Sequence, residues 1–176
     1  MNLTVDQILN QAISAHQEGK LEEAEKKYKE IINLQPNHAV AHVNLGTLLQ
    51  RLGKFEEAEV SFKKAIKIRP DFAEAYFNLG NTQKILKKLV EAEISFKKAI
   101  KLKPDFTTAY NNLGNIQLEL DKYEEAELSY KNAIEQNPDF AGAYDNLGNV
   151  KMKLGKYEEA EINYKKAMEL EPKYIT

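Results

Sequence analysis

Apolar and small side chains recur along this chain at helical spacing, in two successive stretches joined by a short polar turn. In the stretch 73–106, Tyr76, Leu79, Gly80 and Leu86 fall on one face of a first helix. A second face follows at the same spacing, formed by Leu89, Ala92, Phe96, Ala99 and Ile100. The pattern therefore predicts a pair of amphipathic helices in this stretch.

The same pair of helices is repeated along nearly the whole chain. Three residue types mark a period of 34 residues: Pro36, Pro70, Pro104, Pro138 and Pro172; Gly46, Gly80, Gly114 and Gly148; Ala24, Ala58, Ala92, Ala126 and Ala160. A fixed period of this length is typical of helix–turn–helix repeats. We therefore expect one elongated all-α domain over 1–176. Its repeats are 5–38, 39–72, 73–106, 107–140 and 141–174.

The residues around each predicted helix start carry capping signals. Thr4 with Gln7, and Asp71 with Glu74, have the spacing of a capping box. An aspartate also follows the proline directly in three repeats: Asp71, Asp105 and Asp139. These aspartates are predicted to cap the first helix of the next repeat.

Small residues are expected where the chain turns and where two helices approach closely. Three glycines stand between the paired helices, where a left-handed turn residue is needed: Gly19, Gly53 and Gly155. Asp121 and Lys87 take this place in the other repeats, so those turns should be less ideal. Within the helices, Gly80 faces Ala92 and Ala99, and enlarging it should overpack the contact by roughly 1–3 kcal/mol.

Composition and charge argue against several classes of function. Acidic and basic residues nearly cancel, 27 against 25, so no strong field would steer nucleic acid or an anionic membrane. Only Arg51 and Arg69 supply the arginine fork that favours phosphate. The absence of cysteine excludes disulfides, thiolate metal sites and a thiol nucleophile. The opening MNLTVDQILN does not read as a secretory signal, and we expect a soluble, cytoplasmic protein without cofactors.

At these positions the chain resembles the tetratricopeptide repeat family. The motif is carried by Tyr76-x-x-Leu79-Gly80, Ala92-x-x-x-Phe96 and Pro104, with close copies at 107–140 and 141–174. The resemblance implies a right-handed superhelical α-solenoid whose first helices line a concave groove for proteins or peptides. The repeat 5–38 is degenerate, and His42 replaces the motif aromatic in the second repeat. The tyrosine usual three residues after the glycine is also absent, since Leu49, Gln83, Gln117 and Lys151 stand there.

An asparagine recurs in every predicted first helix, although asparagine is a mediocre helix former. The row is Asn10, Asn44, Asn78, Asn112 and Asn146; a partial second row is Asn81, Asn115 and Asn149, with Ile13 and Thr47 in the earlier repeats. A side-chain amide offers both a donor and an acceptor, as a peptide unit does. The row resembles the asparagine ladder of the repeats of O-linked N-acetylglucosamine transferase, which grips the backbone of protein substrates. We expect these residues to contact an extended peptide; the alternative is that they bond neighbouring helices and stabilise the stack.

The residue before each ladder asparagine gives the groove two halves. These residues are Leu9, Val43, Phe77, Asn111 and Asp145, so the N-terminal half is apolar and the C-terminal half polar. We expect an apolar side chain of the partner near Val43 and Phe77. The alternative is that Phe77 packs against a neighbouring helix.

Other candidate sites have a structural explanation. His38 and His42 have metal-ligand spacing, but no third ligand is evident and His42 fills a core position, so no metal is expected. Ser61, Ser95 and Ser129 recur without an associated histidine, which argues against a hydrolase triad. The glutamates of the second helices form i,i+4 pairs with lysine: Glu59–Lys63, Glu93–Lys97 and Glu161–Lys165.

These observations favour a non-enzymatic scaffold that binds a protein or extended peptide in its groove. One alternative is end-to-end self-association, because no further helix is predicted to cover Tyr164, Ala167 and Met168. Another is the substrate-recruiting module of a larger, glycosyltransferase-like enzyme.

Overall fold

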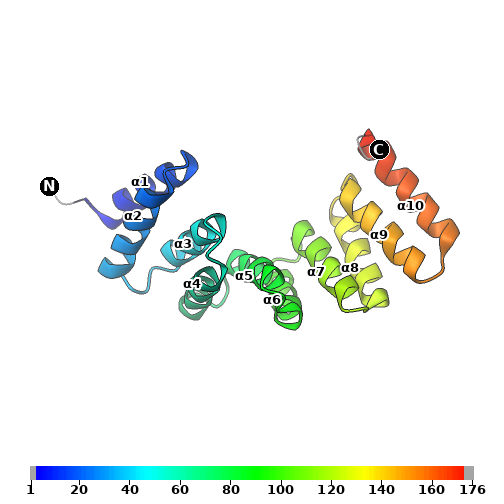
Figure 1. Cartoon of the computed structure of the whole chain (residues 1–176), viewed down its shortest axis with the longest axis horizontal. Coiled ribbons are helices and arrows are strands. Elements are labelled where there is room, and N and C mark those ends of the chain that lie inside the picture. Colours follow the sequence, from blue (N-terminus) through cyan, green and yellow to red (C-terminus); the bar gives the residue numbers. More distant parts are fainter. Residues whose placement is uncertain (1–2, 173–176) are drawn as a thin grey trace. The chain divides into compact units, whose positions relative to one another are not determined.

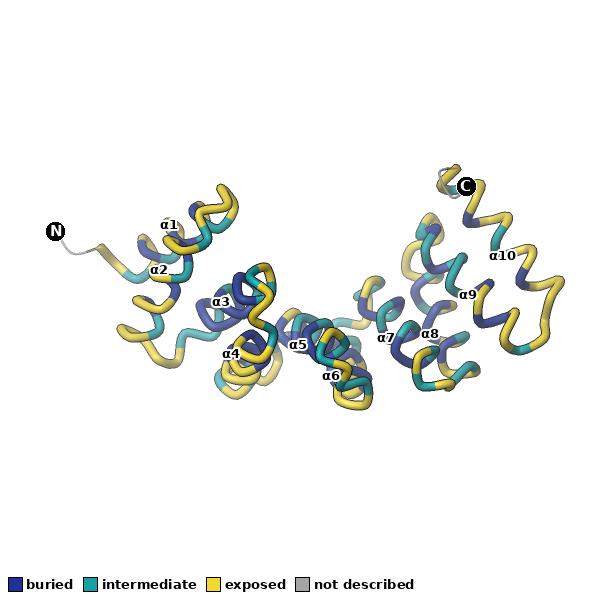
Figure 2. Tube along the Cα trace, viewed as in Figure 1, coloured by how far each residue is buried: buried dark blue, intermediate teal, exposed yellow. Residues whose placement is uncertain are grey.

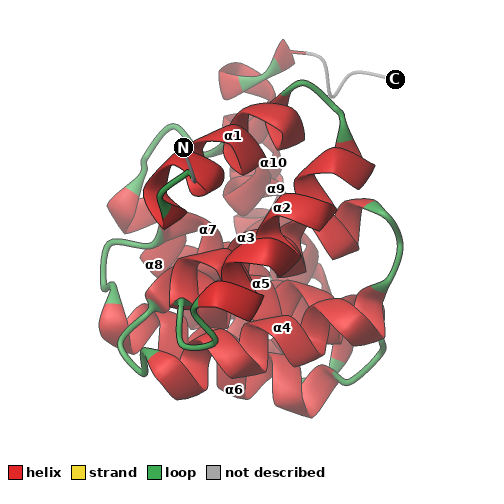
Figure 3. Cartoon of the chain, turned by 90° about the vertical axis from the view of Figure 1, so that its left-hand side faces the viewer, coloured by secondary structure: helices red, strands yellow, loops and turns green. Residues whose placement is uncertain are grey.

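The computed structural model describes residues 3–172, and within this range it holds ten α-helices and no strand (Figures 1 and 3). The helices are α1 (Val5–Gln17), α2 (Leu21–Leu34), α3 (Ala39–Arg51), α4 (Phe55–Ile68), α5 (Ala73–Ile85), α6 (Leu89–Leu102), α7 (Thr107–Glu119), α8 (Tyr123–Gln136), α9 (Ala141–Lys153) and α10 (Tyr157–Leu170). They form an all-α solenoid of consecutive helix pairs. Each first helix begins at the residue where the sequence starts a repeat, while the predicted end of the fifth repeat, at 174, lies outside the described residues.

The chain divides into two compact units, Met1–Lys87 and Lys88–Thr176. In the first unit α1 packs on α2, α2 on α3, α3 on α4 and α4 on α5. In the second unit the same succession runs from α6 to α10. Each helix therefore contacts mainly its neighbours in sequence, which is the packing of stacked repeats.

The helix starts differ from the sequence prediction in one respect. At α1 the capping box is present, since the Thr4 amide donates to Gln7 Oε1 at 2.9 Å and the Gln7 amide to Thr4 Oγ1 at 3.3 Å. The prediction that aspartates cap the later helices is wrong. The cap residues of α5, α7 and α9 make no side-chain hydrogen bond, and they are Phe72, Phe106 and Phe140. Each aspartate lies one residue too early, because the bend after the proline ends on the aromatic residue.

The turns within the helix pairs confirm the predicted left-handed positions. Gly19, Gly53 and Gly155 have φ of +78°, +73° and +72°. Asp121 and Lys87 adopt the same conformation at +57° and +59°. In this conformation a Cβ atom lies too close to the following carbonyl oxygen, so these two turns carry strain that the glycine turns avoid.

The cores contain an aromatic side chain of the second helix packed against a glycine of the first. Tyr130 is completely buried, and a Cβ added to Gly114 would lie 2.6 Å from its ring. Gly46 stands in the same relation to Phe62, at 2.7 Å. Only glycine permits this approach, so the recurring glycine has the mechanical role expected from the sequence. Figure 2 shows buried segments in dark blue alternating with exposed segments in yellow along the helices.

Ion pairs join successive repeats on their second helices. The predicted i,i+4 pairs are present, with nitrogen–oxygen distances of 2.6 Å for Glu59–Lys63 and Glu93–Lys97. A second lysine from the following repeat meets the same carboxylate. These contacts are Glu25–Lys54 at 3.6 Å, Glu93–Lys122 at 2.6 Å and Glu127–Lys156 at 3.4 Å. The sequence analysis did not identify them, because the partners are 29 residues apart.

Candidate functional site

The five ladder asparagines lie on the first helix of each pair. Asn44, Asn78, Asn112 and Asn146 are half-buried, whereas Asn10, in the degenerate first repeat, is exposed. Three of them belong to the first unit and two to the second, and the two sets have different surroundings.

In the first unit, Asn44 lines a pocket of about 390 Å³ formed by α1, α2 and α3. The other lining residues are Ile13, His16, Gln17, Tyr28, Thr47 and Arg51. The Asn44 side chain makes no hydrogen bond with any residue that the structure describes, so its donors and acceptor are available to a ligand. The pocket therefore combines an apolar part with several polar groups, as ligand sites commonly do.

One edge of this pocket is formed by Arg51 and His16. Arg51 is exposed, and its Nη1 donates to the carbonyl oxygen of His16 at 3.1 Å. The His16 ring packs edge-on against Tyr28, with centroids 6.2 Å apart. Burial, followed by the charge of Arg51, lowers the pKa of His16 below 6.5, so the imidazole is neutral at pH 7. The guanidinium keeps further N–H groups for an anionic group of a ligand.

Asn78, the next ladder residue of the first unit, joins the stack through its backbone. Its carbonyl oxygen accepts from Thr82 Oγ1 at 2.8 Å and from Gln50 Nε2 at 3.3 Å. Gln50 also donates to Thr82 Oγ1 at 2.7 Å, which connects α3 to α5. The Asn78 side-chain amide is not hydrogen-bonded to any of the described residues.

In the second unit, Asn146 has a structural partner. Its Nδ2 donates to Oδ1 of Asn111, 3.0 Å away on the preceding first helix. Asn111 is 9% exposed, so this bond lies in a largely buried position. In the first unit, Leu9 and Val43 occupy the position of Asn111. Asn44 and Asn78 therefore have no polar side chain there with which to bond. This side-chain hydrogen bond of Asn146 therefore has no counterpart at Asn44 or Asn78.

Two asparagines of the second row accept hydrogen bonds from tyrosines of the second helices. Tyr130 Oη donates to Asn115 Oδ1 at 2.7 Å, and Tyr164 Oη to Asn149 Oδ1 at 2.9 Å. Both bonds join the two helices of one repeat, which is the stack-supporting role left open by the sequence. Asn81 is half-buried at the corresponding position of the third repeat.

Two residues predicted to meet an apolar side chain of the partner differ in accessibility. Val43 is 7% exposed and belongs to the core of the first unit. Phe77 is half-buried. Val43 therefore offers little surface, because α3 turns this position toward the neighbouring helices.

The two histidines have structural roles. Nδ1 of His38 accepts from the Ala41 amide at 3.1 Å and caps α3. His42 is 4% exposed and its Nε2 lies 3.0 Å from the Pro36 carbonyl oxygen. Across the residues described, no cluster of three potential metal ligands occurs. None of the described helices is both long and apolar enough to cross a lipid bilayer.

Comparison with known proteins identifies the family to which these repeats belong. Family models described as tetratricopeptide repeat match residues 27–60, 73–106, 107–140 and 141–174, and another described as TPR repeat matches 51–84. The chain belongs to the tetratricopeptide repeat family. None of the curated protein sequences matches it.

Several solved tetratricopeptide repeat structures are similar to this chain over nearly its full length. A crystal structure of MamA is 25% identical, with a TM-score of 0.88 and coverage of 98% of both chains. MamA 41-end from Desulfovibrio magneticus RS-1 is 22% identical, with a TM-score of 0.89 and coverage of 100% and 99%. YrrB, described as a TPR protein with an unusual peptide-binding site, is 22% identical, with a TM-score of 0.85 and coverage of 98% and 89%. These likenesses establish the fold.

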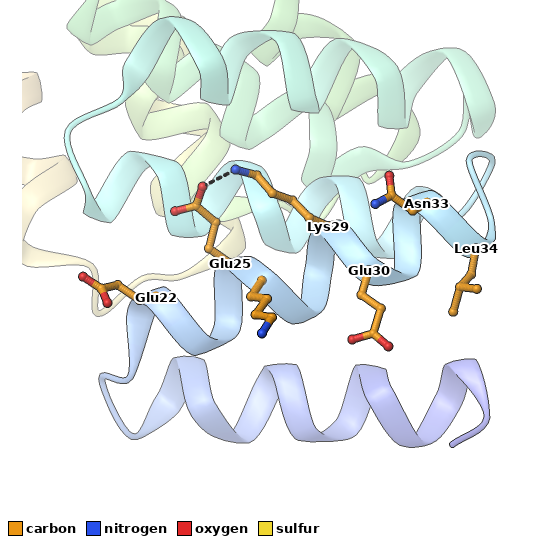
Figure 4. A pocket seen from close by; sticks show the side chains of 7 residues that line it. Glu22, Glu25, Lys29, Glu30, Asn33 and Leu34 are labelled. Carbon is orange, nitrogen blue, oxygen red and sulfur yellow. Dashed lines mark hydrogen bonds and ion pairs between the residues drawn. The ribbon is translucent and has the colours of Figure 1, made fainter. Parts of the chain in front are cut away.

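A further depression lies on α2 of this tetratricopeptide repeat protein, but it is an open helix face. Its side chains come from one helix only, and among them Lys29 Nζ contacts Glu25 Oε1 at 2.5 Å (Figure 4). By contrast, the Asn44 pocket draws on three helices. Sequence reasoning missed Arg51, His16 and Tyr28 there, since none of these contacts follows the 34-residue period.

Proposed function

We propose that this tetratricopeptide repeat protein is a non-catalytic scaffold that binds an extended segment of another protein across its first helices. The side chains of Asn44 and Asn78 would contact the peptide backbone. The observation that carries the proposal is the Asn44 pocket. There an amide that no described residue satisfies lies beside apolar and cationic groups from three helices.

An asparagine amide suits a peptide backbone because it can donate to a carbonyl oxygen and accept from an N–H group. Such contacts are independent of the bound sequence, and each stabilises the complex by about 1 kcal/mol. Two or three of them, reduced by the entropy of ordering the ligand, give modest affinity. Asn10 and Asn112 remain candidate contacts under the same reasoning.

The pocket adds a preference for particular side chains. Ile13 can receive an apolar side chain, and Arg51 can pair with a carboxylate at the rim. We therefore expect the bound segment to carry an acidic residue close to an apolar one. Ile13 takes the place of Val43 as the residue expected to contact an apolar side chain of the partner. Phe77 keeps that role further along the same unit.

The other asparagines are assigned mainly to the stack. Asn146 bonds Asn111, and the oxygens of Asn115 and Asn149 are used by tyrosine hydroxyls. Their remaining N–H groups could still meet a ligand, as could Asn81. YrrB, a protein of the same fold, has a peptide-binding site, so peptide binding is an established use of this architecture.

The test begins with an array of peptides of about a dozen residues, which is longer than the segment needed to pass Asn10, Asn44 and Asn78 at about 10 Å per repeat. The array would vary acidic and apolar residues independently. The best-binding peptide is then titrated by calorimetry against the wild type, Asn44→Ala and Arg51→Ala. The control is Asn33→Ala, the same change on the exposed face of α2.

Asn44→Ala should weaken binding about fivefold, the equivalent of about 1 kcal/mol, and leave the melting temperature unchanged. Arg51→Ala should weaken binding similarly and reduce its dependence on salt. Asn33→Ala should bind as the wild type does. Unchanged affinity in Asn44→Ala would contradict the proposal, and a matching loss of thermal stability would assign Asn44 to the stack. The alternative, that the chain is the substrate-recruiting module of a larger glycosyltransferase-like enzyme, remains a prediction from the sequence alone.

A further inference from the structure

Another pocket of the first unit lies where α2, α3 and α4 meet the bend at Pro36. Its volume is about 590 Å³, and it shares no lining residue with the Asn44 pocket. We call it the His42 pocket. Its apolar walls and polar groups are Ile32, Pro36, Asn37, His42, Lys64, Lys67 and Ile68. The pocket therefore combines two cations with apolar surface, and no acidic residue lines it.

The two lysines of the His42 pocket have no acidic partner. Their neighbour on α4, Lys63, pairs with Glu59 at 2.6 Å. Neither Lys64 nor Lys67 forms an ion pair with any residue that the structure describes, and both are exposed. The two lysines lie one helical turn apart, where like charges repel. An anion between them would relieve this repulsion.

The later repeats carry different residues at two positions of this pocket. An aspartate replaces Asn37 and a tyrosine replaces His42; these are Asp71, Asp105 and Asp139, and Tyr76, Tyr110 and Tyr144. Both lysines recur only at Lys98 and Lys101, where Asp71 accompanies them. The second repeat thus combines two lysines with the loss of the nearby acid, and a smaller ring replaces the phenol.

His42 brings a buried ring nitrogen to the pocket. Its Nε2 lies 3.0 Å from the Pro36 carbonyl oxygen, and because a carbonyl only accepts, Nε2 carries the hydrogen. The neutral ring then keeps a lone pair on Nδ1, which makes no hydrogen bond with the described residues. Every fully buried side-chain nitrogen and oxygen among these residues has a partner, so Nδ1 is open to solvent. The pocket is the opening that the ring lines.

The charges around His42 keep its ring neutral in the free protein. Burial lowers the pKa of His42, and the charges of Lys64 on α4 and His38 at the start of α3 lower it further. The hydrogen bond to Pro36 opposes this shift. Lys67 lines the same pocket, while α2 and the bend add no titratable group to it. A bound anion would offset the charge of Lys64 and favour a proton on Nδ1.

We propose that the His42 pocket binds a phosphate monoester whose apolar body lies against Ile32 and Ile68. The two negative charges of the ester match Lys64 and Lys67, since lysine binds phosphate as a point charge. The complex takes up one proton from solution and holds it between His42 Nδ1 and a phosphate oxygen. A free ester and a phosphorylated side chain of a partner offer the same chemistry. The inference does not rest on peptide binding at the Asn44 pocket.

The test uses phenyl phosphate, titrated into the full chain by calorimetry at pH 7 and pH 8. Inorganic phosphate tests the apolar contact, and a phosphotyrosine peptide tests the protein-borne source. Asn37→Asp restores the acid of the later repeats, and His42→Tyr restores their aromatic residue. The control is Asn33→Asp, the same change at an exposed position of α2 that does not line this pocket. Circular dichroism checks that each variant is folded.

We expect one phenyl phosphate to bind per chain, and inorganic phosphate to bind more weakly. Asn37→Asp should weaken binding about tenfold, because the new carboxylate competes for the lysines, whereas Asn33→Asp should not change it. His42→Tyr should remove most of the affinity, because the phenol fills the pocket and has no basic ring nitrogen. If the peptide binds more tightly than phenyl phosphate, the ester belongs to a partner protein; the reverse order assigns a free ester. Either order supports the site.

The dependence on pH separates this site from lysines that act alone. Raising the pH from 7 to 8 should weaken binding about fivefold, because the complex takes up a proton. Lysines alone would bind more tightly as the pH rises, since an ester with a second pKa of about 6 becomes fully dianionic. Three results would each overturn the inference: no saturable binding, an equal effect of the two aspartate substitutions, or affinity that rises with pH.

Discussion

Replacing Glu127 should destabilise the chain far more than replacing Glu161, although both glutamates occupy the same position of their repeats. Glu127 Oε1 contacts Lys131 at 2.6 Å and Lys151 at 2.8 Å, and its Oε2 contacts Lys156 at 3.4 Å. Its side chain is 12% exposed, and that of Lys151 only 4%. Glu161 is 66% exposed and pairs with the lysine one turn later.

The magnitude follows from the pKa of the Glu127 carboxyl. Burial disfavours its charged form, but hydrogen bonds from Lys131 and Lys151 outweigh burial and lower the pKa from 4.5 to about 2. At about 1.4 kcal/mol for each pKa unit, the carboxylate contributes roughly 3 kcal/mol at neutral pH. Residual contact with water reduces this to roughly 2–3 kcal/mol. The Glu161–Lys165 pair is exposed and screened by water, so it contributes much less to stability.

Glu127→Gln should therefore lower Tm by about 4–12 °C at pH 7, whereas Glu161→Gln should change it little. Thermal unfolding followed by circular dichroism measures both variants. A lowered folded-state pKa contributes stability above pH 4.5, and this stability is lost as the pH falls toward 2. The difference in Tm between Glu127→Gln and Glu161→Gln should vanish over the same pH range. Equal Tm values at pH 7, or a difference that persists at pH 2, would refute the reasoning.

Three further substitutions test the packing. Gly114→Ala should destabilise the chain by about 1–3 kcal/mol, because its Cβ would lie 2.6 Å from the Tyr130 ring; urea unfolding measures the change. Gly142→Ala should instead stabilise by about 0.5–1 kcal/mol in the same assay, since the nearest atom is 3.4 Å away and alanine favours the helix. Burial lowers the pKa of His42, so wild-type stability should fall as the pH drops below 6.5. His42→Phe should reduce that loss, and Tm values above and below pH 6.5 check it.

The helix pairs could be predicted from the sequence because their signals are local and repeated five times. Apolar spacing, the glycine of each first helix and the turn residues each depend on neighbours within one repeat. The starts of α5, α7 and α9 follow from this pattern, although their caps do not. The bend after Pro70 places Phe72 at the cap, and the sequence does not show where that bend ends.

The candidate site was less accessible to sequence reasoning because its contacts join different repeats. Asn146 meets Asn111, 35 residues earlier, and Arg51 meets His16 at the same separation. A search for polar pairs one residue more than a period apart would have found the asparagine pair, whereas Arg51 bonds a backbone carbonyl that residue types do not reveal. Lys151 was noted only as a departure from the family motif, yet it is buried between Glu127 and Glu159 at 2.8 and 2.6 Å. Its role depends on which helices become neighbours.

The most direct test of the central claim is the behaviour of the Asn44 side-chain amide when a peptide binds. A nitrogen–proton correlation spectrum resolves the side-chain NH₂ signals, and Asn44→Ala and Asn146→Ala assign two of them. The account predicts that the Asn44 signal shifts saturably during titration with the best array peptide, while the Asn146 signal, held by Asn111, moves little. An Asn44 signal that stays in place while the peptide binds would contradict the account.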